Sequence, residues 1–564
     1  MSRNGYGHMV LDDIVGRARS LRQERQQKLA KVRTRKQALA YQAHVRRAIA
    51  KACGPRPPKT PLLARTTGVI EQRHHRVEKI LYESRPGCLV SAHLYVPKNM
   101  QGPAPAVLGT CGHSGDGKLE PLYQGFCQRL VRAGFVVLII DPFNQGERDQ
   151  YHRLADRSLV GNCCHAHNMM GKQLELIGDW FGMWRAWDGI RGIDYLVSRP
   201  EVDGTRVGLT GNSGGGTMTT WLWAMDPRIT MAAPSCFVTT FLANLENEIP
   251  ADCEQYPPGV LGAGLEMADF IIARAPDPVM LLGQKYCFFD RRGLREAYAE
   301  VRHFYDALRA PDDNTRLFIG PTPHGFSVHN QEAMVDFFAC HAGTSVTRVR
   351  RPGELAPGSQ VTPQGNTIAA GATPIYELIG RRADELSQAR ESLSRPVLIQ
   401  TVRDLLHLPP GDGEAPHYRV LRGTTGSGHR MARYAVETER DVRAILHKRM
   451  TEPRHIHTLD VEPRVTLLVP HLASDEELGQ GAASLARGRQ PLYLLDPRGL
   501  GESRPDEGSD DFFHPYGMDY MFHGHELLFG GSYLGRRVFD VVRTLDLLMA
   551  EGAVKIDLVG CGQG

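Results

Sequence analysis

The chain has 564 residues, a length that allows three or four domains of ordinary size. With 41% hydrophobic and 23% charged residues it is typical of a globular protein, and no apolar run approaches the roughly 18 residues of a membrane span. The N-terminus lacks the basic and then apolar pattern of a signal peptide, so we expect a cytoplasmic protein. Its eleven cysteines are sparse and odd in number, which indicates buried or reactive thiols rather than a disulfide framework.

The formal net charge of +4 is unevenly distributed. Residues 1–60 carry fifteen Lys and Arg against three Asp and Glu, a balance of +12, so the rest of the chain sums to −8. A basic arm can bind nucleic acid or an anionic membrane, but here apolar residues recur at helical spacing and no nucleic-acid motif accompanies the charge. We therefore expect a basic helical arm over residues 1–58 that lies on the acidic remainder of the chain, with neither nucleic acid nor membrane as a partner.

Strands and helices alternate after Pro58. Strands are predicted over residues 76–82, 88–95, 104–109, 135–140, 207–210, 278–283 and 316–320, and helices over 123–133, 174–196, 293–308 and 331–340. This alternation predicts an α/β fold, a mostly parallel sheet with helices on both faces.

A second α/β unit is predicted after a linker. Residues 343–373 are rich in Gly, Pro, Thr and Ser, and a helix over 375–394 follows them. Four sequence motifs of the first unit have counterparts in the same order in the second. GTCGHSG corresponds to LVPHLAS, DPFNQGER to DPRGLGES, and VGLTGNSGG to LVGCGQG, while the pattern D-x-x-R-x-x-D occurs unchanged in both units. We interpret this as a tandem duplication with four parts: a basic arm (1–58), a catalytic unit (59–342), a linker and helix (343–395), and a second unit (396–564).

The strongest motif is Gly211-Asn212-Ser213-Gly214-Gly215, a G-x-S-x-G between a predicted strand and a predicted helix. This context is typical of a nucleophile elbow, in which glycines permit a sharp turn that presents the serine hydroxyl. The alternative is an ordinary glycine-rich turn. The flanking elements and a suitably placed later histidine favour Ser213 as a nucleophile.

A serine nucleophile needs a base, which in this arrangement is a histidine after the last strand. His324 in GPTPHGF directly follows the strand 316–320, whereas His329 lies nearer the next helix. We expect His324 to be the base. The orienting acid should follow the strand 278–283, where Asp290 is the only carboxylate in the loop.

Residues from about 60 to 342 resemble the bacterial acetyl xylan esterase and prolyl-oligopeptidase-like branch of the α/β-hydrolase superfamily. The matching stretches are PEVDGTRVGLTGNSGGGT, NLENEIPADCEQ, FFDRRG and GPTPHGFS. The resemblance implies a serine hydrolase that cleaves an acetyl or similar short-chain ester, on a carbohydrate for example. A peptidase of the prolyl-oligopeptidase type is the second candidate, although no β-propeller repeat precedes the unit.

This sequence departs from the family at the acid. Members of the family place an aspartate directly before FFD, where this chain has Cys287. Asp290 is our first choice, and Asp252 and Glu254 in PADCEQ are the alternatives. The missing aspartate also keeps open a tandem scaffold without catalytic activity.

The acyl oxygen should be stabilised by backbone N–H groups. One is expected from Gly214, and the others from His113 and Ser114 in the loop after the strand 104–109. The alternative interpretation of His113 is that its side chain packs against the loop or caps it.

No metal or cofactor is expected. Cys163, Cys164, His165 and His167 in CCHAH form a cluster, but adjacent cysteines do not readily share one tetrahedral zinc ion and no C-x₂-C pair accompanies them. The expected partner is a small ester or an acetylated carbohydrate, and the oligomeric state is left open, with a homo-oligomer as the alternative to a monomer.

The second unit is expected to be degenerate. Its elbow has Gly562 where the first has Ser213, and Cys561 comes one position too early to replace it. The sequence then stops at Gly564, before the elements that carry a base. Either the chain continues in a longer protein or the half-unit is completed by packing on the first unit. The resemblance favours the former, because relatives of this branch often carry a second, degenerate hydrolase unit.

Overall fold

The computed structural model describes most of the chain. The described residues are 6–98, 100–155, 160–161, 163–249, 251–411, 413–426, 429–450, 458–479, 491–505 and 519–564. Within these ranges, no helix combines the length and the apolar character needed to cross a membrane.

The described residues form two compact units. The large unit contains residues 20–391, and the small unit contains residues 1–19 and 392–564. The basic arm predicted over residues 1–58 is thus divided between them.

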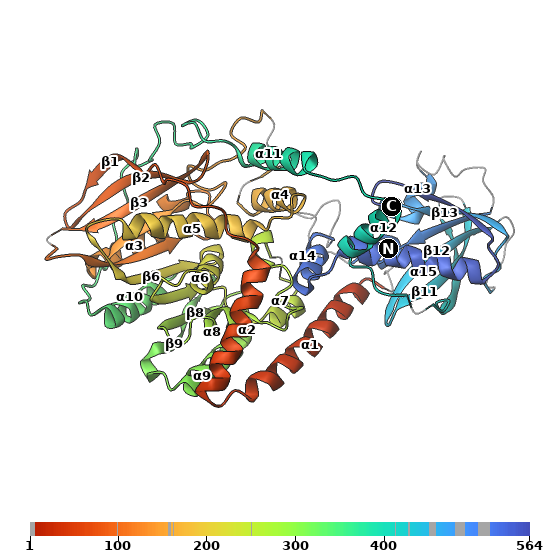
Figure 1. The fold of residues 1–564 in the computed structure, drawn as a ribbon, viewed down its shortest axis with the longest axis horizontal. Coiled ribbons are helices and arrows are strands. Elements are labelled where there is room, and N and C mark those ends of the chain that lie inside the picture. The colour runs from red at the N-terminus through yellow and green to blue at the C-terminus, as the bar shows by residue number, and fades with distance from the viewer. Residues whose placement is uncertain are drawn as a thin grey trace. The chain divides into compact units, whose positions relative to one another are not determined.

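A nine-stranded sheet forms the centre of the large unit (Figure 1). Its order is β1-β2-β3-β5-β4-β6-β7-β8-β9. The pairs from β1 to β5 are antiparallel, and those from β5 to β9 are parallel. The strands are β1 (Arg65–Glu71), β2 (His75–Arg85), β3 (Cys88–Pro97), β4 (Ala104–Thr110), β5 (Val136–Ile140), β6 (Val202–Asn212), β7 (Met231–Ser235), β8 (Val279–Tyr286) and β9 (Thr315–Pro323). The predicted α/β class is confirmed.

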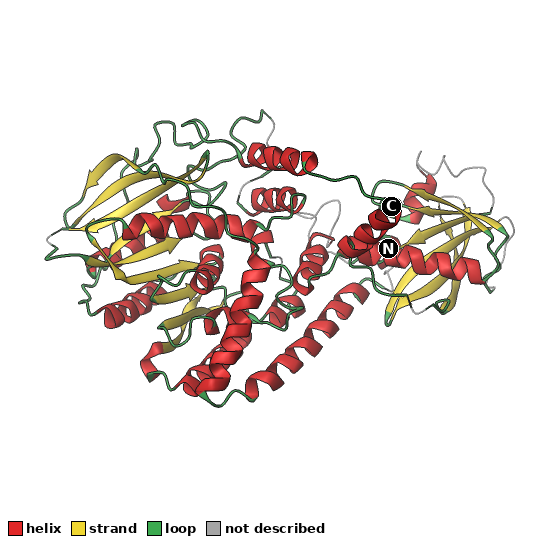
Figure 2. Ribbon diagram, in the orientation of Figure 1, coloured by secondary structure: helices red, strands yellow, loops and turns green. Residues whose placement is uncertain are grey.

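Helices cover both faces of this sheet (Figure 2). The helices of the large unit are α2 (Arg35–Cys53), α3 (Pro121–Arg132), α4 (Cys164–Glu175), α5 (Phe181–Val197), α6 (Gly214–Met225), α7 (Phe241–Glu246), α8 (Met267–Ile272), α9 (Arg291–Leu308), α10 (Val328–Ala342) and α11 (Ile375–Gln388). The helix α1 (Met9–Ala30) begins in the small unit and ends in the large one. The single helix predicted over 174–196 is wrong at its start, because the chain turns at Gly178 with a positive φ of 78°.

Alternating side chains of the central strands face the two helical layers. Val107 and Val137 belong to a buried cluster that includes α3 and α10. Leu108 and Leu138 point to the other face, where Gly192 allows α5 to approach them closely. Since both faces are covered, nearly every residue of β4 and β5 is apolar and buried.

Ion pairs fix the second part of the basic arm within the large unit. The guanidinium of Arg25 is buried, 2.5 Å from the carboxylate of Asp269 and 2.6 Å from that of Glu300. The hydroxyl of Tyr41 also donates to Asp269, at 2.9 Å. Arg25, a basic residue of the arm, therefore neutralises acidic groups of the same unit. This agrees with the expectation that the basic arm lies on the acidic remainder of the chain.

Part of the segment predicted as a linker, residues 343–373, is instead packed into the large unit. Val361 and Thr362 are buried, and their amides donate to the carboxylate of Glu147, each at 2.7 Å. The same carboxylate accepts from the buried ammonium of Lys118 at 2.6 Å. Composition cannot reveal such bonds, because they depend on a residue some 200 positions earlier in the chain.

The small unit contains a six-stranded sheet of order β10-β11-β12-β14-β13-β15. Its elements are α12 (Arg395–Leu405), β10 (Tyr418–Gly426), β11 (His429–Glu439), β12 (Val442–Met450), β13 (Arg464–Val469), α13 (Ser474–Gly479), β14 (Leu492–Asp496), α14 (Asp519–Phe529), α15 (Tyr533–Ala550) and β15 (Lys555–Gly560). Leu467 of β13 packs in a cluster with Leu547 of α15, and Leu468 packs with Leu478 of α13 on the other face.

The small sheet repeats part of the large one. The strands β11-β12-β14-β13-β15 have the same order and directions as β2-β3-β5-β4-β6. Thr110 pairs with Gly211 in the large sheet, and Val469 pairs with Gly560 in the small one. This register places Gly562 where the large unit has Ser213, as the sequence landmarks predict, and supports the tandem duplication.

Candidate active site

Four neighbouring parallel strands of the large unit end at a group of polar side chains. Ser213 follows β6, Cys236 follows β7, Cys287 follows β8 and His324 follows β9. Because parallel strands share their carboxyl edge, residues more than 100 positions apart in sequence come together there. Ligands of open α/β sheets bind at this edge, so we take it as the candidate active site.

The turn that carries Ser213 has the geometry of a nucleophile elbow. Ser213 has φ 59° and ψ −124°, a region that residues other than glycine rarely adopt, and its N–H donates to the carbonyl of Ser235 at 2.9 Å. A Cβ at Gly211 or Gly215 would collide with Thr110 of the adjacent strand. The motif therefore needs glycine on both sides of the serine, because β4 passes too close for a side chain.

His324 lies in the loop between β9 and α10. Its Nδ1 is 3.1 Å from the Sγ of Cys287, and the ring of Phe288 stacks on it with centroids 4.2 Å apart. Burial, together with repulsion from His113, lowers the pKa of His324 to about 4. The imidazole is therefore neutral near pH 7.

Cys287 occupies the place expected for the orienting acid, and a second thiol lies beside it. The ligand atoms of Cys236, Cys287 and His324 all lie within 4.8 Å of one another. The hydrogen bond between the two thiols lowers the pKa of Cys236 and, with burial, raises that of Cys287. No sequence motif indicated Cys236. Its position next to Cys287 and His324 follows only from the order of the strands, in which β7 lies between β6 and β8.

The structure does not bring Asp290 to His324, which corrects our first choice of acid. The carboxylate of Asp290 caps α9 by accepting the N–H of Arg292 at 2.7 Å, and it also pairs with the guanidinium of that residue. Asn247 donates to it at 3.2 Å. Among the described residues, no hydrogen bond or ion pair joins Asp290 to His324, because the start of α9 turns this side chain away.

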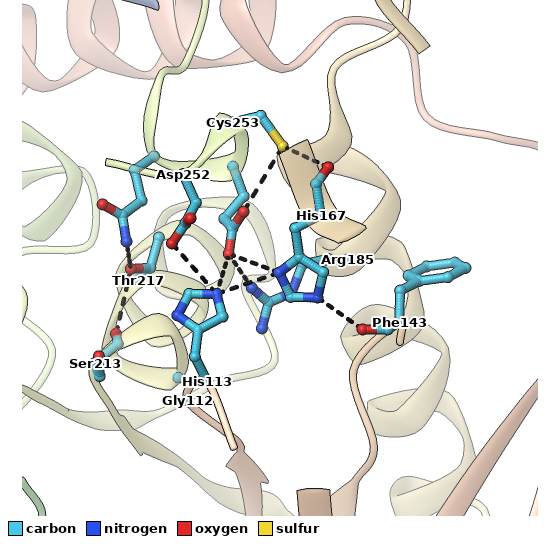
Figure 3. A network of polar contacts seen from close by, with 12 residues as sticks. Gly112, His113, Phe143, His167, Arg185, Ser213, Thr217, Asp252 and Cys253 are labelled. Carbon is cyan, nitrogen blue, oxygen red and sulfur yellow. Dashed lines mark hydrogen bonds and ion pairs between the residues drawn. The ribbon is translucent and has the colours of Figure 1, made fainter. Parts of the chain in front are cut away.

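The alternative acids lie at a different histidine, His113 (Figure 3). Its Nε2 is 3.0 Å from the carboxylate of Glu254, 3.4 Å from that of Asp252 and 3.2 Å from the Nδ1 of His167. Arg185 forms an ion pair with the same Glu254 carboxylate. Sequence order placed Asp252 and Glu254 after β7 correctly but could not tell which histidine they would face.

The charges of this network can be assigned from its contacts. The Nε2 of His167 lies 2.7 Å from the carbonyl of Phe143, to which it donates, so its Nδ1 can accept a hydrogen bond from His113. Burial lowers the pKa of His113, but Asp252 and Glu254 outweigh burial and raise it well above its usual value. Burial lowers the pKa of His167, which stays neutral. The raised pKa favours an imidazolium at His113, whose side chain is half-buried.

This imidazolium lies beside the elbow. A Cβ on Gly214 would be 2.8 Å from the Cε1 of His113, so the ring covers the residue after the nucleophile. The side chain of Gln145 holds the loop by donating to the carbonyls of Gly112 at 2.7 Å and Ser114 at 2.8 Å. In the described part of the chain, the amides of His113, Ser114 and Gly214 donate to no other residue, and these are the three amides predicted to bind an oxyanion.

The CCHAH segment, where no metal was expected, contributes to the same region. The ligand atoms of Cys164, His113 and Asp252 lie within 4.8 Å of one another, as do those of His113, His167 and Glu254. The ion pair with Arg185 already places a cation on Glu254, so this region holds its own positive charges.

Comparisons with known proteins agree with this fold. Residues 13–243 match the model of the Abhydrolase family. The predicted resemblance to the α/β-hydrolases is confirmed, and the large unit has an α/β-hydrolase fold. The putative hydrolase YtaP of Bacillus subtilis (strain 168) is 28% identical over 205 residues, which are 34% of this chain and 64% of that protein, just under two thirds of its length.

Solved structures that align with part of this chain include esterases. A putative acetyl xylan esterase from Bacteroides fragilis NCTC 9343 aligns with a TM-score of 0.42 and 18% identity, over 51% of this chain and 76% of that one. A glucuronoyl esterase from Solibacter usitatus aligns with a TM-score of 0.41 and 16% identity, over 53% of this chain and 91% of that one.

Proposed function

We propose that the large unit is a serine hydrolase that cleaves a short-chain carboxylic ester of the acetyl type, with a carbohydrate alcohol as the leaving group. The observation that carries this proposal is the elbow itself: Ser213 at positive φ, between β6 and α6, on the edge that also carries His324. A strained serine at this place is the arrangement in which α/β-hydrolases expose a nucleophile.

The reaction proceeds through an acyl-enzyme. The Oγ of Ser213 attacks the ester carbonyl while the Nε2 of His324 accepts the hydroxyl proton, and the same proton passes to the leaving alcohol as the C–O bond breaks. Water then attacks the acyl carbon, gives a proton to His324 and releases the acid as Ser213 recovers its proton. Each cycle consumes one ester and one water.

Two sets of donors stabilise the negative oxygen. The amides of Gly214 and of the loop at His113 and Ser114 supply hydrogen bonds, and the half-buried imidazolium of His113 adds a positive charge next to Gly214. In this mechanism His324 transfers the proton, and His113 stabilises the negative charge of the oxyanion.

Cys287 takes the place of the orienting acid. Its Sγ lies 3.1 Å from the Nδ1 of His324, so it holds the ring in position. A neutral thiol stabilises the imidazolium less than a carboxylate does, and we expect slow turnover compared with an enzyme that has aspartate at this place.

The test combines active-site labelling with turnover. A fluorophosphonate probe should label the full-length protein, and Ser213→Ala should abolish both labelling and the release of p-nitrophenol from p-nitrophenyl acetate. His324→Ala should lower turnover about 10³-fold or more. Absence of labelling in the wild type would contradict the proposal and favour the scaffold without catalytic activity.

Substrate class and acid need separate measurements. A series of acetyl, butyryl and longer esters should show the fastest turnover with acetyl, whereas cleavage of a prolyl peptide with no ester hydrolysis would favour the peptidase. Asp290→Asn should retain near wild-type turnover, while Asp252→Asn and Glu254→Gln should lower it by weakening the charge on His113. Loss of activity in Asp290→Asn alone would restore our first choice of acid.

A further inference from the structure

We propose that Cys236, Cys287 and His324 form a binding site for one thiophilic divalent cation, zinc in particular. The three side chains come from the loops that follow β7, β8 and β9, so the ligands are positioned by three adjacent parallel strands. Sites built on rigid elements need little rearrangement when the ligand binds.

The distances fit a tetrahedral ion. With bonds of about 2.3 Å to sulfur and about 2.0 Å to nitrogen, neighbouring ligand atoms of a zinc ion are separated by about 3.5–3.8 Å. Here all three ligand atoms lie within 4.8 Å of one another, and the Sγ of Cys287 is 3.1 Å from the Nδ1 of His324. Small rotations of the side chains therefore suffice, and water can take the fourth position.

The donor set favours zinc over harder cations. Two thiolates and one imidazole select zinc rather than magnesium or calcium, which prefer oxygen. Cys236 is buried, whereas Cys287 and His324 are partly exposed, so an ion can enter from solvent while its inner ligand stays shielded. Phe288 and Phe289 lie against the ring of His324 and provide an apolar wall.

Binding has a defined proton balance. Each ion replaces the protons of the two thiols, so one zinc entering the site releases up to two protons to the buffer. No oxidation or reduction takes place, and a chelator should reverse the reaction.

Occupancy would switch off the hydrolase, a consequence that rests on the proposed function. A metal on the Nδ1 of His324 leaves the proton on Nε2, the atom that must accept the proton of Ser213. The metal-bound chain would therefore keep its fold but lose its base.

The experiment is a cobalt titration of the reduced, metal-free, full-length chain. Cobalt has a thiolate charge-transfer band in the near ultraviolet and visible bands typical of tetrahedral coordination, so it reports the ligands directly. We expect saturation at one ion per chain and displacement by zinc. Cys236→Ser and Cys287→Ser should each weaken binding about tenfold or more, and the double variant should lose the charge-transfer band.

The matched control is Cys340→Ser, which removes an exposed thiol on α10 and should leave the titration unchanged. A wild type without the band would overturn the proposal, as would a band that persists in the double variant. A band that is lost in Cys164→Ser and kept in the double variant would also overturn it, because the metal would then lie at His113. A disulfide between Cys236 and Cys287 that resists reduction and prevents cobalt from binding would also overturn the proposal.

The readouts separate this proposal from the proposed function. Cobalt absorption requires no catalysis, so the metal site can be established even if the fluorophosphonate fails to label Ser213. If the metal-free protein is labelled, one equivalent of zinc should prevent labelling and a chelator should restore it. Unchanged labelling of a zinc-saturated protein would overturn the inhibitory consequence alone.

Discussion

The two elbows of this protein have similar φ angles and different side chains at the central position. Ser213 has φ 59° and comes directly after β6, an interior strand of the large sheet. Gly562 has φ 55° and follows β15, the last strand in the order of the small sheet. A Cβ on Gly215 would collide with the carbonyl of Thr110, and one on Gly564 would collide with the carbonyl of Val469, its counterpart in the repeat. The turn is therefore maintained by glycines against a neighbouring strand, whether or not a nucleophile is present.

The amide that follows each elbow is used differently. Gln563 donates its N–H to the Nδ1 of His471 at 3.1 Å, whereas the amide of Gly214 is predicted to bind the oxyanion. In the small unit, His471 thus accepts the hydrogen bond of the amide that corresponds to the proposed oxyanion donor of the large unit. A hydrolase fold can lose its reaction and keep its sheet, because packing and catalysis depend on different residues.

A buried aspartate at the end of β5 and of β14 extends the comparison. Asp141 accepts from the buried ammonium of Lys118 at 2.5 Å, and Asp496 lies 3.2 Å from the Nε2 of His447. Both carboxylates also accept a backbone N–H from the next turn of the chain. The large unit balances its carboxylate with a permanent cation and the small unit with a titratable one.

The largest expected effect concerns the elbows. Ser213→Ala should lower ester hydrolysis by about 10³-fold or more, because it removes the hydroxyl of the proposed nucleophile. Gly562→Ser, the reciprocal change, should create no reactive serine, since a Cβ there would meet the ring of His471. Fluorophosphonate labelling of Gly562→Ser in the Ser213→Ala background measures this, and labelling there would show that the two elbows are chemically equivalent.

The next effect is on the stability of the two sheets. Asp141→Asn should lower the free energy of unfolding of the large unit by about 3–5 kcal/mol, because Lys118 loses a partner while fully buried. Asp496→Asn should cost the small unit about 1–3 kcal/mol, because His447 can release its proton.

All five tryptophans lie in the large unit, so their fluorescence during denaturant unfolding follows that unit alone. Amide hydrogen exchange in β12 and β14 reports the small unit. The control is Asp336→Asn, which breaks an exposed pair with Arg348 and should cost less than about 1 kcal/mol. Equal losses for Asp141→Asn and Asp496→Asn would refute the distinction between the two cations.

A smaller effect is expected from restoring an acid beside His324. Cys287→Asp should raise kcat for p-nitrophenyl acetate about tenfold, because a carboxylate stabilises the imidazolium that forms as Ser213 attacks. Cys340→Ser serves as the control for removing a thiol. A variant that is still labelled at Ser213 but turns over no faster would show that Cys287 already fulfils this role.

The smallest effect is the pH dependence of the small unit. Burial lowers the pKa of His447, but the hydrogen bond and charge of Asp496 outweigh burial and raise it above the usual 6.5. The stabilisation from protonated His447 is therefore complete below about pH 6.5 and is lost as the pH rises through the higher pKa of the folded state. Amide hydrogen exchange in β12, corrected for its intrinsic rate, should show protection that falls as the pH rises over this range. In His447→Gln the protection should depend less on pH. Constant protection in the wild type would contradict the raised pKa of His447.

Motif and chain order were sufficient to predict where the main residues of the candidate site lie in the fold. The glycines around Ser213 predicted the elbow, and the position of His324 after the last strand predicted its place on the same edge. These predictions succeed because each depends on a local turn or on the order of parallel strands. The repeat was also visible in the sequence, since its landmarks are turn residues under strict steric limits.

Only the tertiary structure decided which groups face each histidine. Asp290, Asp252 and Glu254 all follow strands that end at the candidate site, yet the first caps a helix and the other two surround His113. The direction of a side chain depends on where the next helix begins, and a few residues of loop can reverse it. By itself the sequence determined the fold, the elbow and the missing serine of the repeat, because these follow from periodicity and glycine sterics. The pairing of His324 with two thiols, and of His113 with two acids, required the packed sheet that brings separate loops together.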